Sequence, residues 1–200
     1  YKNKLLPPKK WDSDTVVIFC GAVLEPWSDK SVAGGIGGSE EAVIYLSKAL
    51  TRQGKKVTVY NECGEDEGTR DGVAYVNYRR FNPRDEFHTI ISWRTTLTFS
   101  FVKKAHNKWV WLHDVSPTLD ITKEDVARTD KFIVLSEYHK TLLPSFVPES
   151  KIFVSSNGGN STNCTCGGAG PHITDDTHYM HCAKVTAKRD WKFHLKKLID

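Results

Sequence analysis

Short apolar runs alternate with amphipathic stretches along most of this chain. The apolar runs are rich in β-branched and aromatic residues and end in polar or glycine-containing turns, which is typical of buried strands. Strands are expected at residues 16–23, 57–61, 73–80, 89–93, 109–112, 132–135 and 152–155, and helices at residues 97–106, 123–128 and 137–143. Such alternation indicates a mostly parallel sheet, so we predict an α/β fold, one doubly wound Rossmann-like domain of about six or seven strands.

A glycine-rich turn leads from the first expected strand into the clearest amphipathic helix. Residues 34–54 read GGIGGSEEAVIYLSKALTRQG, where Ser39 can cap the helix and Gly54 can end it in the left-handed conformation. A helix start at the carboxyl edge of a strand presents free backbone N–H groups and the positive end of the helix dipole, which favours phosphate. A phosphorylated ligand is therefore the first functional hypothesis, and a tight turn without a ligand is its alternative.

Two common phosphate-binding motifs do not match this turn. The P-loop requires Lys followed by Ser or Thr after its glycines, and no such pair stands there. The dinucleotide fingerprint requires a third glycine where this chain has Glu40, and residues 24–38 are longer than its tight turn. Glu62, after the second strand, could imitate the acid that binds a ribose, so a dinucleotide site stays open as an alternative.

Five segments in order resemble the amino-terminal domain of a glycosyltransferase with the GT-B fold, of the retaining family 4. The segments are GGIGGSEEAVIYLSKAL, GKKVTVYN, KWVWLHDV, KFIVLSEYHKTLL and KIFVSSNG. The resemblance covers about residues 16–158 and implies that residues 1–158 form a Rossmann-like, acceptor-side domain. It also implies transfer of a sugar from a nucleotide-sugar donor to a hydroxyl acceptor, which is a glycan, lipid or protein, with retained configuration. The family requires no bound metal or other cofactor.

The resemblance assigns a donor-binding role to the glycine turn. Gly37 and Gly38 match positions that contact the donor diphosphate through backbone N–H groups, and Ser39 lies beside them at the helix cap. Carboxylates repel a diphosphate, so Glu40 and Glu41 weigh against tight binding unless both side chains turn away from the turn.

On the acceptor side, His113 matches the family's active-site histidine, which contacts the transferring sugar and is the catalytic candidate here. Asp114 follows it as in the family, and Arg94, also expected at a strand end, is a candidate for binding an anionic group of the acceptor. A hydrogen-bonded core histidine is the alternative for His113. Surface positions are expected for three other histidines, His88, His106 and His139.

The sequence changes character after Gly158. Residues 159–200 are rich in cysteine and histidine, and the last glutamate of the chain is Glu149. We therefore expect this chain to lack the second domain of the family, with the E-x7-E element that holds the nucleotide sugar. We expect this chain alone to be inactive or very weak, and a truncated or frame-shifted reading after Gly158 to explain the tail, of which residues 190–199 have the spacing of a short helix.

Two other functions stay open. Thiolates and imidazoles are preferred zinc ligands, but the C-x-C, H-x5-H and H-x2-H-C spacings of the tail differ from those of structural zinc sites. The residues concerned are Cys164, Cys166, His172, His178, His181 and Cys182. The other alternative is a non-catalytic Rossmann-like binding or scaffold module.

Composition excludes further classes of function. The 28 Lys and Arg residues are interspersed with 24 Asp and Glu, for a net charge of +4, so no basic stripe indicates a nucleic-acid partner. No apolar run is long enough to span a membrane and no signal peptide is visible, so we expect a cytoplasmic protein for which peripheral membrane contact stays open. Cys20 and Cys63 fall in or beside expected core strands, where free thiols are expected.

Overall fold

Eight strands pair into one sheet in the part of the chain that the computed structural model describes, residues 7–114 and 120–155. Their order is β3-β4-β2-β1-β5-β6-β7-β8, and all neighbours are parallel except β3 and β4. The strands are β1 (Thr15–Gly21), β2 (Lys56–Asn61), β3 (Gly68–Arg70), β4 (Val73–Asn77), β5 (Glu86–Trp93), β6 (Lys104–Trp111), β7 (Lys131–Val134) and β8 (Ile152–Val154). This mostly parallel, doubly wound sheet confirms the α/β class expected from the sequence.

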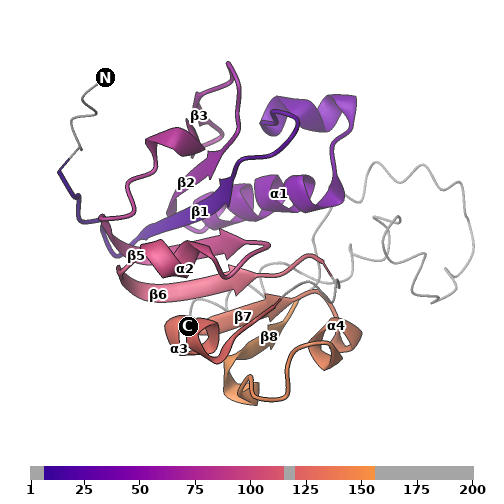
Figure 1. Cartoon of the computed structure of the whole chain (residues 1–200). Helices are drawn as coiled ribbons and strands as arrows, with labels where there is room; N and C mark the ends of the chain where they lie inside the picture. Colours follow the sequence, from indigo (N-terminus) through magenta and orange to yellow (C-terminus); the bar gives the residue numbers. More distant parts are fainter. Residues whose placement is uncertain (1–6, 115–119, 156–200) are drawn as a thin grey trace, which may run out of the picture.

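Helices lie on both faces of the sheet (Figure 1). The longest helix packs on one face, two shorter ones pack on the other, and a fourth contacts β7 and β8. In chain order they are α1 (Gly38–Arg52), α2 (Thr98–Phe101), α3 (Lys123–Arg128) and α4 (Glu137–Thr141). Within the described residues, three short 3-10 helices lie in the connections between elements. They are η1 (Asp29–Gly34), η2 (Tyr78–Arg80) and η3 (Glu149–Lys151).

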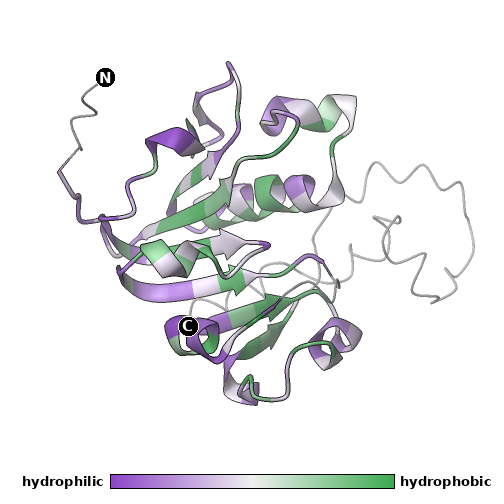
Figure 2. Cartoon of the chain, viewed as in Figure 1, coloured by the Kyte–Doolittle hydropathy of each residue, from purple (hydrophilic) through white to green (hydrophobic). Residues whose placement is uncertain are grey.

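Strand β1 is apolar on both faces because it lies inside the sheet. Val16 and Ile18 pack in the core under α1, whereas Val17 packs in the core on the side of α2 and α3. Burying each such side chain stabilises the fold by about 1.5–3 kcal/mol. Figure 2 shows β1 as hydrophobic along its length, whereas the first part of β6 is hydrophilic.

The direction of winding reverses at β1, which has β2 on one side and β5 on the other. From β1 the chain moves outward to β2 and β4, then returns across the sheet to β5 and continues to β8. In open α/β sheets a crevice forms outside the carboxyl ends of the two strands where this reversal occurs, and ligands bind there. The carboxyl ends of β1 and β5 therefore mark the position of a candidate site.

Several elements differ from the sequence expectation. The helix expected at residues 97–106 is wrong beyond Phe101, because Val102 is extended and fully buried and the chain then enters β6. β4 ends at Asn77, whose side chain accepts a hydrogen bond from the N–H of Arg79 and starts η2. The antiparallel β3 was not expected, and it raises the strand number to eight.

Cys20 and Cys63 are free and buried, as expected. None of the helices within residues 7–114 and 120–155 has the length and apolar character needed to cross a membrane. The expectations for the tail, which include Asn157, Gly158, the cysteine and histidine cluster and the helix at residues 190–199, lie outside the described residues.

Candidate functional site

A long connection, residues 22–37, joins the carboxyl end of β1 to α1. Trp27 in this connection is buried against Trp93 of β5, with ring centroids 6.4 Å apart. Its carbonyl accepts a hydrogen bond from the side chain of Asn61 at 2.7 Å, and its N–H donates to the carbonyl of Glu62 at 2.9 Å. These contacts fix the connection to the ends of β2 and β5.

Ionic contacts hold the following residues of the same connection. Asp29 pairs with Arg70 of β3, and both side chains are largely shielded from solvent. Lys30 Nζ lies 2.5 Å from Asp66 Oδ1, and the hydroxyl of Ser28 donates to Asp66 Oδ2 at 3.0 Å. These contacts tie the connection beside the candidate site to β3 and to the loop before it.

Helix α1 begins earlier than expected. Gly37 is its N-cap and Gly38 its first residue, so Ser39 lies inside the first turn, and the prediction that Ser39 is the cap was wrong. Gly37 already has the extended backbone that a cap residue needs, with φ −59° and ψ 143°. The side chain of Glu40 folds back over it, since a Cβ atom at Gly37 would lie within 2.3 Å of Glu40 Oε2. A carboxylate thus lies beside the helix start where a phosphate was expected.

Arg94 directly follows β5 and adopts a left-handed backbone, with φ 67°. Its N–H donates to the carbonyl of Trp111 in β6 at 2.8 Å, and its guanidinium lies 4.9 Å from the ring centroid of Trp93. The guanidinium donates two hydrogen bonds to the carboxylate of Asp114, from Nε to Oδ2 at 2.7 Å and from Nη2 to Oδ1 at 2.8 Å. Left-handed backbone is costly for a residue other than glycine, and such strain is often found at functional positions.

Pairing shifts the pKa values of Arg94 and Asp114 in the directions expected for an ion pair. Hydrogen bonding to Arg94 lowers the pKa of Asp114, and hydrogen bonding to Asp114 raises the pKa of Arg94. The charge of Glu40 also contributes to the raised pKa of Arg94, which brings the start of α1 within electrostatic reach of the pair. Both charges are therefore present at physiological pH.

His113 lies just after β6 and is half-buried against two tryptophan rings. Its ring centroid is 4.5 Å from that of Trp111 and 5.9 Å from that of Trp93. Burial, together with the positive charge of Arg94, lowers the pKa of His113 to about 3. The imidazole is therefore neutral at physiological pH and does not offer positive charge to a ligand.

His139 was expected at the surface, and that expectation was wrong, because its side chain is buried. It lies in the first turn of α4, where its N–H donates to the hydroxyl of the capping residue Ser136 at 3.0 Å. Its Nδ1 accepts a hydrogen bond from the N–H of Leu135 at 3.3 Å, and its ring also hydrogen-bonds the backbone of Asp114. A backbone N–H can only donate, so Nδ1 is unprotonated and Nε2 carries the proton. The capping serine indicates where α4 begins, but it does not indicate which way the side chain of His139 faces.

These residues fall into two groups at the carboxyl edge of the sheet. At the ends of β5 and β6, Arg94 pairs with Asp114, and His113 packs against Trp93, the residue before Arg94. His139 hydrogen-bonds the backbone of Asp114 and so belongs to the same group. Gly37, Gly38 and Ser39 lie across the switch point at the start of α1. One group offers a neutral imidazole and a guanidinium, and the other offers backbone N–H groups beside a carboxylate.

No cluster of three or more His, Cys, Asp or Glu side chains suited to a metal ion occurs within residues 7–114 and 120–155. Comparison with protein-family models, curated proteins and solved structures finds no match to this chain. Any function assigned to the chain therefore rests on its own fold and side chains.

Proposed function

We propose that this chain is the acceptor-side half of a glycosyltransferase, which transfers a sugar from a nucleotide-sugar donor to a hydroxyl acceptor with retained configuration. The observation that carries this proposal is the position of His113 and Arg94 at the same carboxyl edge as the glycine turn before α1. That edge is where ligands bind in open α/β sheets, beside the switch point between β1 and β5.

The neutral state of His113 suits contact with a sugar. A neutral imidazole carries no charge that would have to be desolvated when an uncharged sugar covers it. Trp93 and Trp111 hold the ring from two sides, so its orientation is fixed before the sugar arrives. In the proposed reaction His113 orients the transferring sugar, and it does not serve as a cationic acid.

Arg94 suits the acceptor rather than the diphosphate. Within the described residues, two of its five N–H donors are used by Asp114, and the proposal assigns the others to hydroxyl or carboxylate oxygens of an acceptor. Because Asp114 balances the charge of Arg94, the pair as a whole attracts an anion weakly. Acceptor recognition in this proposal is therefore by hydrogen bonding.

Donor binding by this half alone is expected to be weak. A helix end contributes about 0.3–1 kcal/mol toward a nearby exposed charge, whereas micromolar affinity requires about 8 kcal/mol. Glu40 opposes even that contribution, because its carboxylate lies against Gly37. We therefore propose that the chain by itself does not catalyse transfer, and that the rest of the donor site belongs to a second Rossmann-like domain.

The test is a titration of the full 200-residue chain, labelled with 15N, with uridine diphosphate and separately with a neutral disaccharide. We expect the nucleotide to shift the amide signals of Gly38 and Ser39 in the millimolar range, and the disaccharide to shift those of Arg94 and His113. Gly38→Asp should abolish the nucleotide shifts. Gly34→Asp is the matched control, because Gly34 and Gly38 both have open space where a Cβ would stand and neither needs a positive φ.

Two results would overturn the proposal. One is the absence of shifts at both groups with nucleotide and disaccharide in large excess, which would leave a non-catalytic scaffold role. The other is an equal loss of nucleotide binding in Gly34→Asp and Gly38→Asp, which would show that the nucleotide responds to net charge and does not bind at the start of α1.

A further inference from the structure

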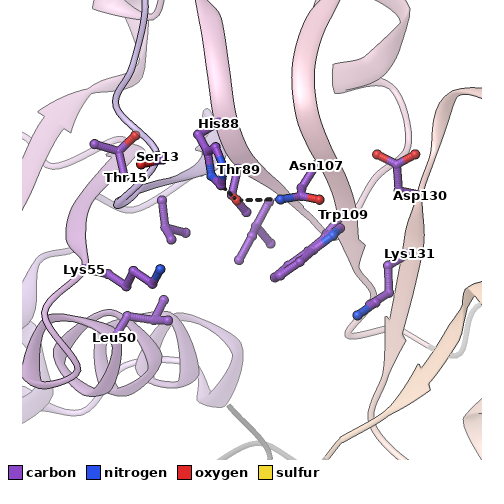
Figure 3. A pocket seen from close by; sticks show the side chains of 12 residues that line it. Ser13, Thr15, Leu50, Lys55, His88, Thr89, Asn107, Trp109, Asp130 and Lys131 are labelled. Carbon is purple, nitrogen blue, oxygen red and sulfur yellow. Dashed lines mark hydrogen bonds between the residues drawn. The ribbon is translucent and has the colours of Figure 1, made fainter. Parts of the chain in front are cut away.

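A cavity opens at the amino edge of the sheet, away from the carboxyl-edge site described above. It has a volume of about 290 Å³ and lies between the end of α1, the first residues of β1 and β7, and the middle of β5 and β6 (Figure 3). Thr15 and Lys131, the first residues of β1 and β7, both line it. The carboxyl-edge group at Arg94 and His113 lies at the other end of these strands, so the two sites are separate.

The sheet presents polar side chains toward this cavity. Thr89 of β5 and Asn107 of β6 are register partners, and the Asn107 amide donates to the Thr89 hydroxyl at 3.1 Å (Figure 3). His88 Nδ1 lies 3.2 Å from the same hydroxyl. On a parallel sheet covered by a helix these positions are normally apolar. These groups hydrogen-bond one another and give this part of the cavity wall a polar strip.

Two ammonium groups approach the cavity from opposite sides (Figure 3). Lys55 follows α1, and Lys131 starts β7 with its Nζ 5.0 Å from the ring centroid of Trp109 and 5.6 Å from that of Phe153. Neither lysine forms an ion pair within the described residues. Asp130, also at the cavity, is bound by the backbone N–H of Lys108 at 2.7 Å.

Burial lowers the pKa of Lys131, and burial and the charge of nearby His106 and Lys55 lower the pKa of His88. His88 therefore contributes a neutral ring, and the charge at the cavity comes from the two lysines and the carboxylate of Asp130, which together leave it net positive. An anion placed between them would gain Coulomb energy in a partly desolvated setting, where a charge pair is stronger than at an exposed surface.

The remaining wall of the cavity is apolar. Ile91 and Trp109 are register partners on the sheet, and Leu50 of α1 faces them from the helix. Small-molecule sites typically have volumes of about 300–1,000 Å³ with apolar walls and a few placed polar groups. The volume of this cavity lies at the lower end of that range, so it fits a ligand of a single ring and not a nucleotide.

We propose that this amino-edge cavity binds a small organic carboxylate with a flat apolar body. The carboxylate lies in the positive field of Lys55 and Lys131, with Asn107 and Thr89 as hydrogen-bonding partners, and the apolar body packs on Trp109 and Leu50. The site is independent of the proposed glycosyl transfer.

The test uses 19F NMR of 4-fluorobenzoate with the full chain, compared with its neutral analogue 4-fluorobenzyl alcohol. We expect the carboxylate to bind and the alcohol to bind at least about fivefold more weakly, the size of effect that one partly shielded charge contributes. Lys131→Gln and Lys55→Gln should each weaken 4-fluorobenzoate binding by a similar factor. Lys123→Gln is the control, because Lys123 is an exposed lysine of α3 that does not line the cavity.

Lys55→Gln keeps the test decisive if Lys131→Gln fails to fold, since Lys55 lies after α1 and outside the sheet. The proposal is overturned if 4-fluorobenzoate does not bind at millimolar concentration, or if both lysine variants bind it like the wild type. Equal binding of the alcohol would overturn the role of the charges. Displacement by an equal concentration of inorganic phosphate would overturn the role of the apolar wall.

Discussion

Arg94 and Asp114 face each other across the ends of two neighbouring strands and form a bidentate ion pair, with N–O distances of 2.7 and 2.8 Å. They are far apart in the sequence and meet because Trp93 and Trp111, just before them, are partners in the register of β5 and β6. The side chains are 38% and 41% exposed. The pair therefore orients the edge of the candidate site and contributes little to stability.

Asp114→Asn is expected to lower the free energy of unfolding by less than about 1 kcal/mol at pH 7, because partly exposed ion pairs contribute about that much. Hydrogen bonding to Arg94 lowers the pKa of Asp114 in the folded state. Its contribution is therefore present above the unfolded pKa of about 4 and is lost as the pH falls through the folded value. The difference in urea midpoint between wild type and variant should be largest at pH 7, smaller at pH 4 and smallest at pH 3. Asp120→Asn is the control, and an equal effect there would contradict the assignment.

His113→Gln is expected to make the protein more resistant to acid. The folded pKa of His113 is lowered to about 3, below the unfolded value of about 6.5, so the unfolded state binds more protons between these values. The stability contributed by neutral His113 is full above pH 6.5 and decreases as the pH falls, by up to about 1.4 kcal/mol per pH unit. Urea titrations from pH 7 to pH 4 should show a shallower loss for the variant. The same result with His106→Gln, an exposed histidine, would count against His113 as the source.

Tyr75→Phe is expected to leave stability unchanged or to raise it by up to about 1 kcal/mol. The ring of Tyr75 is fully buried, and its hydroxyl has no hydrogen-bond partner in the described part of the chain. Removing an unsatisfied buried hydroxyl removes its desolvation cost, while the contact with Arg70, 5.0 Å from the ring centroid, is kept. Thermal unfolding checks this. A destabilisation above 1 kcal/mol would mean that the hydroxyl is satisfied in solution.

Gly72→Ala is expected to destabilise the protein more than Gly54→Ala. Both glycines have positive φ, 78° and 83°, so both substitutions introduce the strain of about 1 kcal/mol that a left-handed backbone imposes on alanine. A Cβ at Gly72 would also lie 2.4 Å from Thr51 Cγ2, whereas the space at Gly54 is open. The difference between the two urea midpoints measures that clash. Equal midpoints would show that the β3–β4 turn moves away from α1 without cost.

Glu40→Gln is expected to raise the affinity for uridine diphosphate severalfold, because the substitution removes a negative charge from the start of α1 and keeps the side chain over Gly37. The amide titration described above measures the change. Glu41→Gln is the comparison, since Glu41 lies near Tyr45, further along the same helix. A larger gain in Glu41→Gln would place the nucleotide on another face of the helix.

Most elements could be predicted because the local sequence preference and the tertiary packing favour the same structure there. α3 has the predicted bounds because Thr122 and Asp125 form a capping box in which each side chain accepts from the other's backbone N–H. The first part of β6 could not be predicted, since Lys104, His106 and Lys108 give it a polar pattern. It is extended because it pairs with β5, and that pairing is a long-range interaction which a local pattern does not contain.

The candidate site shows the same division. The positions of His113 and Arg94 at strand ends could be predicted from the apolar runs before them. The burial of His139 could not, because it depends on acceptors and donors at Leu135 and Asp114 that only the folded chain brings together. The position of the Glu40 side chain over Gly37 could not be predicted either, because it depends on the backbone angles of the turn.

The placement of β1 inside the sheet has a consequence for biosynthesis. One edge of β1 pairs with β2. Its other edge has no partner until β5, which ends at Trp93, has been synthesised. While the ribosome extends the chain at about 5–20 residues per second, the apolar strand therefore has an open edge for several seconds. Such an edge is a template for pairing between nascent chains, so we expect early truncations of this protein to aggregate and chaperones to engage it first at β1.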